Sequence, residues 1–284
     1  MTFYKYHGAG NDFLIADGRD SAVELTAEQI SAICDRHTGI GADGVMVLER
    51  SACQNFRMRY YNSDGSGGMM CGNGGRCIVA FAADLGYGHF SFEAPDGLHE
   101  AELAGGASEQ FSHSPRIIRL KMKDVHGAVS YPAPSGSLDW FLDTGTRHLV
   151  RFVDDVEACD VTGEGRILRH DSRFAPVGVN VNFVSIDKNG GDVFSASVRT
   201  FEKGVEDETL ACGTGIVASS MATWLESRVP ATGQAVRVNV RARISELSVS
   251  FVPSFGDASC SPASFRAENV WLEGPAAYIG KIII

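Results

Sequence analysis

The same short turn occurs twice in the sequence, as Met70-Cys71-Gly72-Asn73-Gly74-Gly75 and as Ala211-Cys212-Gly213-Thr214-Gly215. In each copy a strand-like segment and a polar loop precede the cysteine, and a run of small apolar residues follows it. The two runs, 77–85 and 216–225, are apolar on nearly every side, which predicts helices buried in the middle of a domain. A unit that recurs once in each half predicts two similar domains related by a pseudo-twofold axis.

Most of the remaining chain is predicted to form strands, with one further helix near the start. Thr26 and Gln29 give a capping-box pattern, so this helix should begin after Thr26 and end at Gly39. Apolar runs and alternating patterns predict strands from residue 3 and then over 45–48, 55–61, 117 onward, 180–184, 197–201 and 234 onward. Together these elements predict the α+β class.

The loose, polar region 104–116 is the expected boundary between the two halves. The N-terminal half would then comprise residues 1–116, joined by the C-terminal strand at about 271–284. The C-terminal half would comprise residues 117–270.

The composition limits the class of protein. The 284 residues are 44% hydrophobic and 21% charged, which is ordinary for a globular chain of one large or two small domains. The net charge of −10 argues against a nucleic-acid partner, because such proteins carry a basic surface. No apolar run reaches about 18 residues, so no membrane span is expected. The first residues lack the apolar stretch of a signal peptide, which predicts a cytoplasmic protein.

Seven cysteines are present, and an odd number in a cytoplasmic chain does not predict a disulfide framework. No Cys-x-x-Cys or His-x-x-x-His spacing occurs, so no zinc or other metal site is expected. Cys34, Cys77, Cys159 and Cys260 are expected to be small buried hydrophobic residues.

The repeated turn has the features of an anion site beside a reactive thiol. A helix N-terminus carries unpaired N–H groups and a partial positive charge, and glycines allow a ligand to come close to them. Gly72 with Asn73, and Gly213 with Thr214, would offer these N–H groups to a carboxylate. The same field favours thiolate over thiol at the preceding cysteine.

Two such turns placed face to face would carry out a two-base inversion. The substrate carboxylate would bind the helix N-termini, with its Cα between the sulfur atoms of Cys71 and Cys212. One thiolate would remove the α-proton and the opposite thiol would return a proton to the other face, without metal or organic cofactor. A nucleotide P-loop is not indicated, because neither turn ends in Gly-Lys-Ser/Thr. A cysteine hydrolase using His148 would leave the second cysteine turn unexplained.

The sequence resembles the diaminopimelate epimerase family in several segments that keep their order and spacing. They are Lys5–Phe13, Asn62–Ser66, Met70–Gly74, Val179–Val181, Glu208–Gly215 and, at the end of the chain, Val270–Ala277. The resemblance implies two domains, each a curled, mostly antiparallel sheet around a central helix, with the active site in the cleft between them. It also implies interconversion of LL- and meso-diaminopimelate for lysine and peptidoglycan precursors, and a homodimer.

The resemblance assigns roles by position. It makes Cys71 and Cys212 the acid/base thiols, with Glu202 and His148 near them. It makes the following residues the substrate contacts: Asn11, Asn62, Gly72, Asn73, Asn180, Glu202, Lys203, Gly213 and Thr214. Without the resemblance, Asn62 and Asn180 could simply cap turns, and His148 could be a packed histidine.

Three positions depart from the family pattern. Lys203 stands where most members have the arginine that grips the distal carboxylate, and lysine pairs as a point charge rather than a planar fork. Thr146-Arg147 stands where Asn-Pro is usual, and Arg147 could supply a second positive group. Gly44 replaces a polar residue of some members.

These departures leave other functions open. One alternative is a racemase or epimerase of the same scaffold for proline, hydroxyproline or histidine. Another is a non-catalytic amino-acid-binding protein, and a third is a thiol redox switch.

Overall fold

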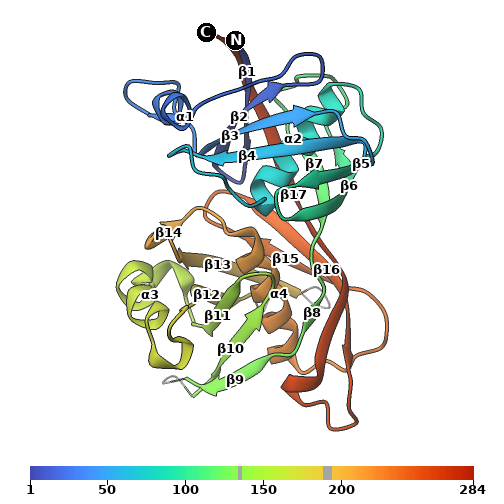
Figure 1. The fold of residues 1–284 in the computed structure, drawn as a ribbon. Coiled ribbons are helices and arrows are strands. Elements are labelled where there is room, and N and C mark those ends of the chain that lie inside the picture. Colours follow the sequence, from blue (N-terminus) through green and yellow to red (C-terminus); the bar gives the residue numbers. More distant parts are fainter. Residues whose placement is uncertain (134–135, 188–193) are drawn as a thin grey trace. The chain divides into compact units, whose positions relative to one another are not determined.

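The computed structural model describes residues 1–133, 136–187 and 194–284, which form two compact units (Figure 1). The first unit comprises Met1–Lys121 and Glu273–Ile284, and the second comprises Met122–Leu272. The division into functional halves at 116/117 and 270/271 stays a prediction.

The first unit is a sheet whose strand order returns to its starting point. Its strands are β1 (Thr2–Gly8), β2 (Asn11–Asp17), β3 (Gly44–Glu49), β4 (Phe56–Asn62), β5 (Phe90–Ala94), β6 (Gly97–Gly106), β7 (Arg116–Lys121) and the end of β17 (Phe265–Ile283). Neighbours from β1 to β7 pair in that order, in parallel for β2–β3 and β4–β5 and antiparallel for the others. Because β7 and β1 both pair with β17, the sheet curls round on itself.

Helix α2 (Gly72–Asp84) is the central element of this unit. All of its residues except Ala83 are buried, and it packs against β1, β2 and β7. The predicted buried helix is therefore confirmed, although it begins at Gly72, with Cys71 as its N-cap.

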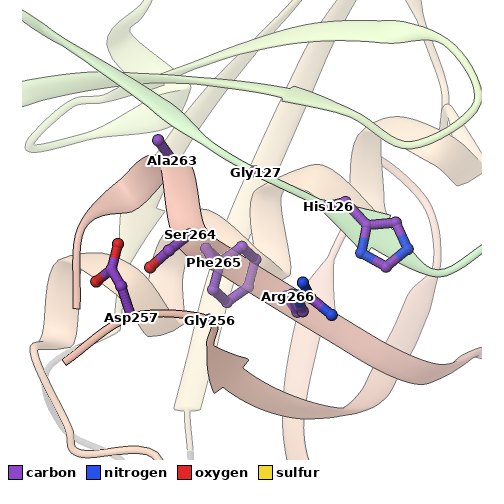
Figure 2. Close-up of a pocket in the computed structure, with 8 residues that line it drawn as sticks. All are labelled: His126, Gly127, Gly256, Asp257, Ala263, Ser264, Phe265 and Arg266. Carbon is purple, nitrogen blue, oxygen red and sulfur yellow. The ribbon is translucent and has the colours of Figure 1, made fainter. Parts of the chain in front are cut away.

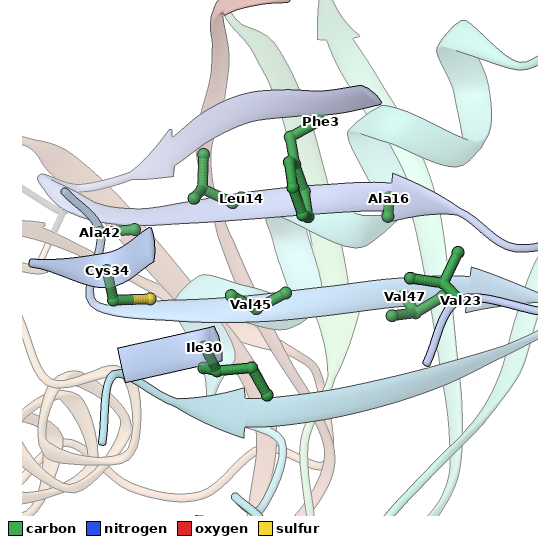
Figure 3. Packing of buried hydrophobic residues seen from close by; sticks show 9 residues of the cluster. All are labelled: Phe3, Leu14, Ala16, Val23, Ile30, Cys34, Ala42, Val45 and Val47. Atoms are coloured by element: carbon green, nitrogen blue, oxygen red, sulfur yellow. The ribbon is translucent and has the colours of Figure 1, made fainter. Parts of the chain in front are cut away.

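Helix α1 (Ala27–Cys34) covers the other face of β1–β3, as Figure 3 shows. Ile30 and Cys34 of α1 pack in one cluster with Phe3, Leu14 and Val45. With a helix on each face these strands are buried on both sides, which explains the unbroken apolar run at 45–48.

The capping box of α1 is confirmed, because Thr26 and Gln29 exchange both hydrogen bonds. The predicted end at Gly39 is wrong, since the helix stops at Cys34. The Asp35 carboxylate accepts hydrogen bonds from the backbone N–H groups of His37 and Thr38, which bends the chain into a turn.

The second unit contains the following strands: β8 (Val125–His126), β9 (Val129–Pro132), β10 (Leu138–Asp143), β11 (Arg147–Phe152), β12 (Asn180–Ile186), β13 (Phe194–Glu202), β14 (Asp207–Thr209), β15 (Val236–Arg241), β16 (Glu246–Phe255) and the start of β17. Its helices are α3 (Val161–Arg169) and α4 (Gly213–Ser227). From Gly213 to Leu225, α4 is buried except at Thr214, so the second predicted buried helix is confirmed.

The two units repeat one pattern of strand pairing. The pairs β10–β11, β11–β12, β12–β13, β13–β15 and β15–β16 alternate between antiparallel and parallel exactly in the sense of β1 to β6. Helix α3 lies between β11 and β12, just as α1 lies between β2 and β3 in the first unit. Helix α4 comes before β15, just as α2 comes before β5. The predicted α+β class with two similar domains around central helices is therefore confirmed.

The seven cysteines are free thiols, and two expectations about them fail. Cys34 and Cys77 are buried as predicted, but Cys159 is only half-buried and Cys260 is exposed. Cys260 lies in the surface loop between β16 and β17, where the Asp257 carboxylate accepts hydrogen bonds from Ser259 and Ser261. In the part of the chain that the structure describes, no helix is long and apolar enough to cross a membrane.

Candidate functional site with two thiol turns

The first thiol turn is formed by Cys71 at the start of α2. Its extended backbone (φ −106°, ψ 155°) and its Sγ make it the N-cap, and Sγ accepts a hydrogen bond from the Gly74 N–H at 3.3 Å. Ser, Thr, Asp or Asn usually takes this place and satisfies one of the first-turn donors. Here the acceptor is sulfur, which therefore lies at the positive end of the helix dipole.

Asn11 lies beside this sulfur, with its Oδ1 3.9 Å from Cys71 Sγ. The Asn11 side-chain nitrogen donates to the Asp43 carboxylate, so the amide oxygen is the atom left to face the thiol. Asp43 is held by an ion pair with Arg36 at 2.6 Å and by a hydrogen bond from the backbone N–H of Asp12.

Asp12 anchors the start of β2, where Asn11 lies. Burial by itself would raise the pKa of its carboxyl, but hydrogen bonds and ion pairs with Arg36 and Lys5 outweigh burial, so the pKa is lowered. The carboxylate is therefore charged at neutral pH and holds Asn11 in place.

Arg76 supports the same turn from inside the unit, although sequence reasoning gave it no role. Its fully buried guanidinium donates to the Gly72 carbonyl at 3.1 Å, to Asn73 Oδ1 at 2.9 Å and to the Pro275 carbonyl at 3.4 Å. Among the residues the structure describes, no carboxylate forms an ion pair with it. A lone arginine at the start of an apolar helix was the available signal, since buried cations are rare.

Asn62 closes a tight turn at the end of β4. Its side-chain nitrogen donates to Ser66 Oγ at 3.0 Å, and its backbone N–H donates to the Ser66 carbonyl at 2.9 Å. These contacts fit the turn-capping alternative, and a substrate contact stays a prediction. The absence of a side chain at Gly44, one of the departures from the family pattern, is explained by packing. A Cβ there would lie 2.6 Å from the Tyr61 carbonyl oxygen.

The second thiol turn is formed by Cys212 at the start of α4. The residue is again extended (φ −107°, ψ 112°) and is the N-cap, but its side chain makes no capping bond to the helix backbone. Its Sγ lies 3.5 Å from Thr214 Oγ1, and the Thr214 carbonyl accepts from Thr144 Oγ1 at 3.0 Å.

A buried polar network continues from this turn. His148 Nε2 lies 3.0 Å from Thr214 Oγ1 and 2.9 Å from Thr146 Oγ1. Burial lowers the pKa of His148 to about 3, so the ring is neutral at physiological pH. Thr146, one of the departures from the family pattern, is thus part of the hydrogen-bonded network around the thiol.

Asn182 and Thr200 complete the network and were both missed by sequence reasoning. Asn182 Nδ2 lies 3.1 Å from His148 Nδ1, and Asn182 Oδ1 accepts from Thr200 Oγ1 at 3.0 Å. No local sequence signal identifies them, because the contacts depend on pairing among β11, β12 and β13.

Asn180, opposite His148 in the β11–β12 register, positions the segment that follows β13. Its Oδ1 accepts from the Lys203 N–H at 2.8 Å, and its Nδ2 donates to the Arg147 carbonyl at 3.3 Å. Glu202 accepts a hydrogen bond from Thr209 Oγ1 at 2.9 Å. Burial raises the pKa of Glu202, and the Thr209 bond partly opposes this.

The side chains of Lys203 and Arg147 differ in their surroundings. Lys203 is exposed, and within the described ranges no carboxylate pairs with it. The Arg147 guanidinium lies 5.3 Å from the centroid of the Phe141 ring and donates to the Phe174 carbonyl at 3.2 Å. Arg147 therefore packs on the core of its own unit, and its role as a second positive group stays a prediction.

The predicted residues thus fall into two groups. Asn11, Cys71, Gly72 and Asn73 gather around the start of α2 in the first unit, where Asn62 closes its own turn. His148, Asn180, Glu202, Lys203, Cys212, Gly213 and Thr214 belong to the second unit. No cluster of three or more His, Cys, Asp or Glu that could hold a metal ion occurs among the described residues.

A hollow in the second unit contains none of the predicted residues (Figure 2). His126 of β8 and the β16–β17 loop with Asp257 line it, together with Ser264 and Arg266. The thiol turns, rather than this hollow, are therefore the candidate site.

The fold is shared with solved structures. A crystal structure of a phenazine biosynthesis protein of the PhzF family from Bacillus anthracis superposes with a TM-score of 0.70. It covers 100% of this chain and 99% of its own length at 13% identity, a likeness that shows the fold alone. The chain therefore has a twinned α+β fold with a cysteine at the start of each central helix.

The sequence comparisons define the family. The family model described as diaminopimelate epimerase matches residues 3–112 and 140–252. A diaminopimelate epimerase of Chlorobaculum tepidum is 40% identical, covering 98% of this chain and 99% of the relative. One from Flavobacterium psychrophilum is 37% identical over the whole of both chains. The chain belongs to the diaminopimelate epimerase family and is an isomerase.

Two glycines in the thiol turns provide a test of this packing. A Cβ on Gly215 would lie 2.4 Å from Asn182 Oδ1, whereas a Cβ on Gly74 would meet its nearest atom, Cys71 Sγ, at 3.4 Å. We expect overpacking in Gly215→Ala to destabilise the protein by about 1–3 kcal/mol. This loss remains after the gain of about 1 kcal/mol in helix propensity from alanine has been subtracted. Gly74→Ala meets only ordinary contacts, so it should leave the stability unchanged or raise it by up to about 1 kcal/mol. Urea unfolding measures both, and equal stabilities would contradict the close approach.

Proposed function

We propose that this protein interconverts LL-2,6-diaminopimelate and meso-2,6-diaminopimelate, for lysine and peptidoglycan precursors, by a two-cysteine acid/base mechanism. The observation that carries the proposal is the repeated N-cap cysteine, Cys71 on α2 and Cys212 on α4. A two-base inversion needs two equivalent proton carriers, and the family membership supplies the substrate class.

In the proposed mechanism, the α-carboxylate binds at the first turns of the two helices. The donors are the N–H groups of Gly72 and Asn73 and those of Gly213 and Thr214, positions that have no carbonyl partner within a helix. One cysteine, as thiolate, removes the α-proton, and the other, as thiol, protonates the opposite face.

Negative charge develops on the substrate as the α-proton leaves. The same backbone donors then stabilise the carboxylate as it takes up that charge, and one such donor typically contributes about 3 kcal/mol. Buried Arg76 adds a positive charge that holds the Gly72 and Asn73 turn. No cofactor is part of this proposal.

His148 and Glu202 are proposed to act beside the thiols, as the family resemblance implies. His148 is neutral because it is buried, so it affects Cys212 through hydrogen bonds with Thr214 rather than through charge. Burial raises the pKa of Glu202, and a substrate ammonium group beside it would favour the charged carboxylate and so pair with it.

The far end of the substrate is proposed to contact Asn11, Asn62, Asn180 and Lys203. Lys203 would pair with the distal carboxylate, and Asn180 would set its position through the Lys203 N–H. The exposed ammonium is available for this, since the described residues offer it no carboxylate.

The reaction itself is tested by incubation with LL-diaminopimelate in deuterated water, following Cα–H exchange and the meso isomer. Cys71→Ala and Cys212→Ala should each reduce epimerisation at least about a hundredfold, the usual contribution of a general acid or base. Cys260→Ala, which changes an exposed cysteine, serves as the control. Absence of exchange in the unmodified protein would refute the substrate, and exchange in the double variant would refute the mechanism.

Lys203→Met should raise the KM for diaminopimelate about 10- to 100-fold, because a charged hydrogen-bonded pair contributes about 1.5–3 kcal/mol. Lys203→Arg should restore binding, while Lys281→Met, at an exposed lysine of β17, should leave KM unchanged. Steady-state kinetics gives the answer, and an unchanged KM in Lys203→Met would remove Lys203 from the site. A panel of proline, hydroxyproline and histidine tests the alternative substrates.

We further propose that the protein is a cytoplasmic homodimer, as the family resemblance implies. Sedimentation equilibrium should then give a mass of twice 30.4 kDa. A monomer mass at micromolar concentration would contradict the dimer.

A further inference from the structure

Asn182 on β12 is completely buried, and its amide orientation is determined by its surroundings. The atom that lies 3.1 Å from the Leu149 carbonyl oxygen must be the amide nitrogen, because a carbonyl can only accept. The amide oxygen then accepts from Thr200 Oγ1 at 3.0 Å. Both ends of the amide are therefore satisfied in one orientation only.

This orientation determines the tautomer of His148. Asn182 Nδ2 also lies 3.1 Å from His148 Nδ1, so Nδ1 must be an acceptor and carries no proton. A neutral imidazole has one proton, which must then be on Nε2. The fully buried ring has no acidic partner in the described network that would favour the charged form.

The Nε2 proton faces two hydroxyl groups. Thr146 Oγ1 lies 2.9 Å and Thr214 Oγ1 3.0 Å from Nε2, and the two hydroxyl oxygens are 3.0 Å apart. The Thr214 oxygen therefore accepts from His148 directly or from Thr146. Its own proton is then available to Cys212 Sγ at 3.5 Å, and a thiolate is a stronger acceptor for it than a second hydroxyl.

We propose that Asn182 is a positioning residue that holds His148 as the Nε2–H tautomer, so that Thr214 donates its hydroxyl proton to the Cys212 thiolate. The inference rests on the proposed function for the role of Cys212 as a proton carrier. Every donor in the relay points towards the sulfur, from Asn182 through His148 and Thr214.

The two thiol turns differ in the groups around the sulfur atom. Cys71 Sγ already accepts from the Gly74 N–H, and buried Arg76 lies five residues further along α2. Cys212 has no capping bond to the helix backbone, and the fifth residue after it is Val217. The Thr214 hydroxyl lies beside the Cys212 sulfur, whereas Asn73, at the corresponding place in the first turn, accepts from Arg76.

Gly215 ties this relay to the start of α4. A Cβ there would meet the Asn182 amide oxygen at 2.4 Å and the Cys212 Cβ at 3.3 Å. The second glycine of the turn thus leaves room for the Asn182 amide oxygen beside the start of α4.

The tautomer can be measured without substrate, on the full protein labelled with ¹⁵N-histidine. Long-range ¹H–¹⁵N correlation spectra should show His148 as the Nε2–H form, assigned by comparison with His148→Gln. Asn182→Asp is isosteric but places a carboxylate at Nδ1, and it should convert the ring to the Nδ1–H form. Thr200→Val, which leaves the Asn182 nitrogen in place, is the matched control and should keep the Nε2–H form.

The effect on the thiol is read from alkylation by iodoacetamide, resolved for each cysteine by peptide mass spectrometry. Thr214→Val removes the donor to the thiolate, and Asn182→Asp makes His148 Nε2 an acceptor that draws the hydroxyl proton away from the sulfur. Both variants should therefore slow alkylation of Cys212 about 10- to 100-fold at neutral pH. Cys71 is the internal control and should react at the unmodified rate in both variants. Thr200→Val should change neither cysteine.

The Nδ1–H tautomer in the unmodified protein would overturn the inference. An unchanged Cys212 rate in folded Thr214→Val protein would also overturn it, even if Asn182→Asp failed to fold. The predicted tautomer and alkylation rates, in a protein that does not epimerise diaminopimelate, would refute the proposed function and leave the relay standing.

Discussion

The structure depends on the burial of two helix N-termini. The first N–H groups of a helix have no partner inside the helix, and burying them without an acceptor costs free energy. In this protein α2 and α4 are the central elements of their units, so their ends cannot simply be solvated. Cysteine at each N-cap and glycine in each first turn allow an acceptor from outside the helix to come close, and we propose that the substrate carboxylate is this acceptor. The same four residues of each turn therefore serve the fold, which needs acceptors for buried N–H groups, and the proposed chemistry, which needs donors for a carboxylate.

The two turns meet this constraint differently. At Cys71, a backbone N–H from Gly74 reaches the sulfur, and Arg76 holds the turn from inside with bonds to neutral acceptors. At Cys212, side chains from three neighbouring strands provide the surrounding polar groups, with His148 at their centre. A repeated architecture has thus acquired unequal local electrostatics. Such inequality suits a pair of thiols in which one carries the proton while the other does not.

Elements governed by local signals were predicted well. The capping box of α1, the buried helices and the alternating strand β4 all follow from neighbouring residues in the chain. The predictions were wrong where one polar side chain, outside the periodic pattern, determines the local path of the backbone. Asp35 ends α1 before Gly39 by accepting two backbone N–H groups, and Asp257 organises the loop that exposes Cys260. Periodicity says nothing about either side chain.

The sequence alone determined the repeated cysteine turns and the buried helices that follow them, because an N-cap and an apolar run are properties of adjacent residues. Only the tertiary structure decided what surrounds each sulfur. His148, Asn182 and Thr200 are distant in sequence and meet only because β11, β12 and β13 pair in one register. A shift of one residue in that register would turn their side chains to the other face of the sheet. The two cysteine turns could therefore be predicted from the sequence, whereas the hydrogen-bonded network around Cys212 could be identified only from the tertiary structure.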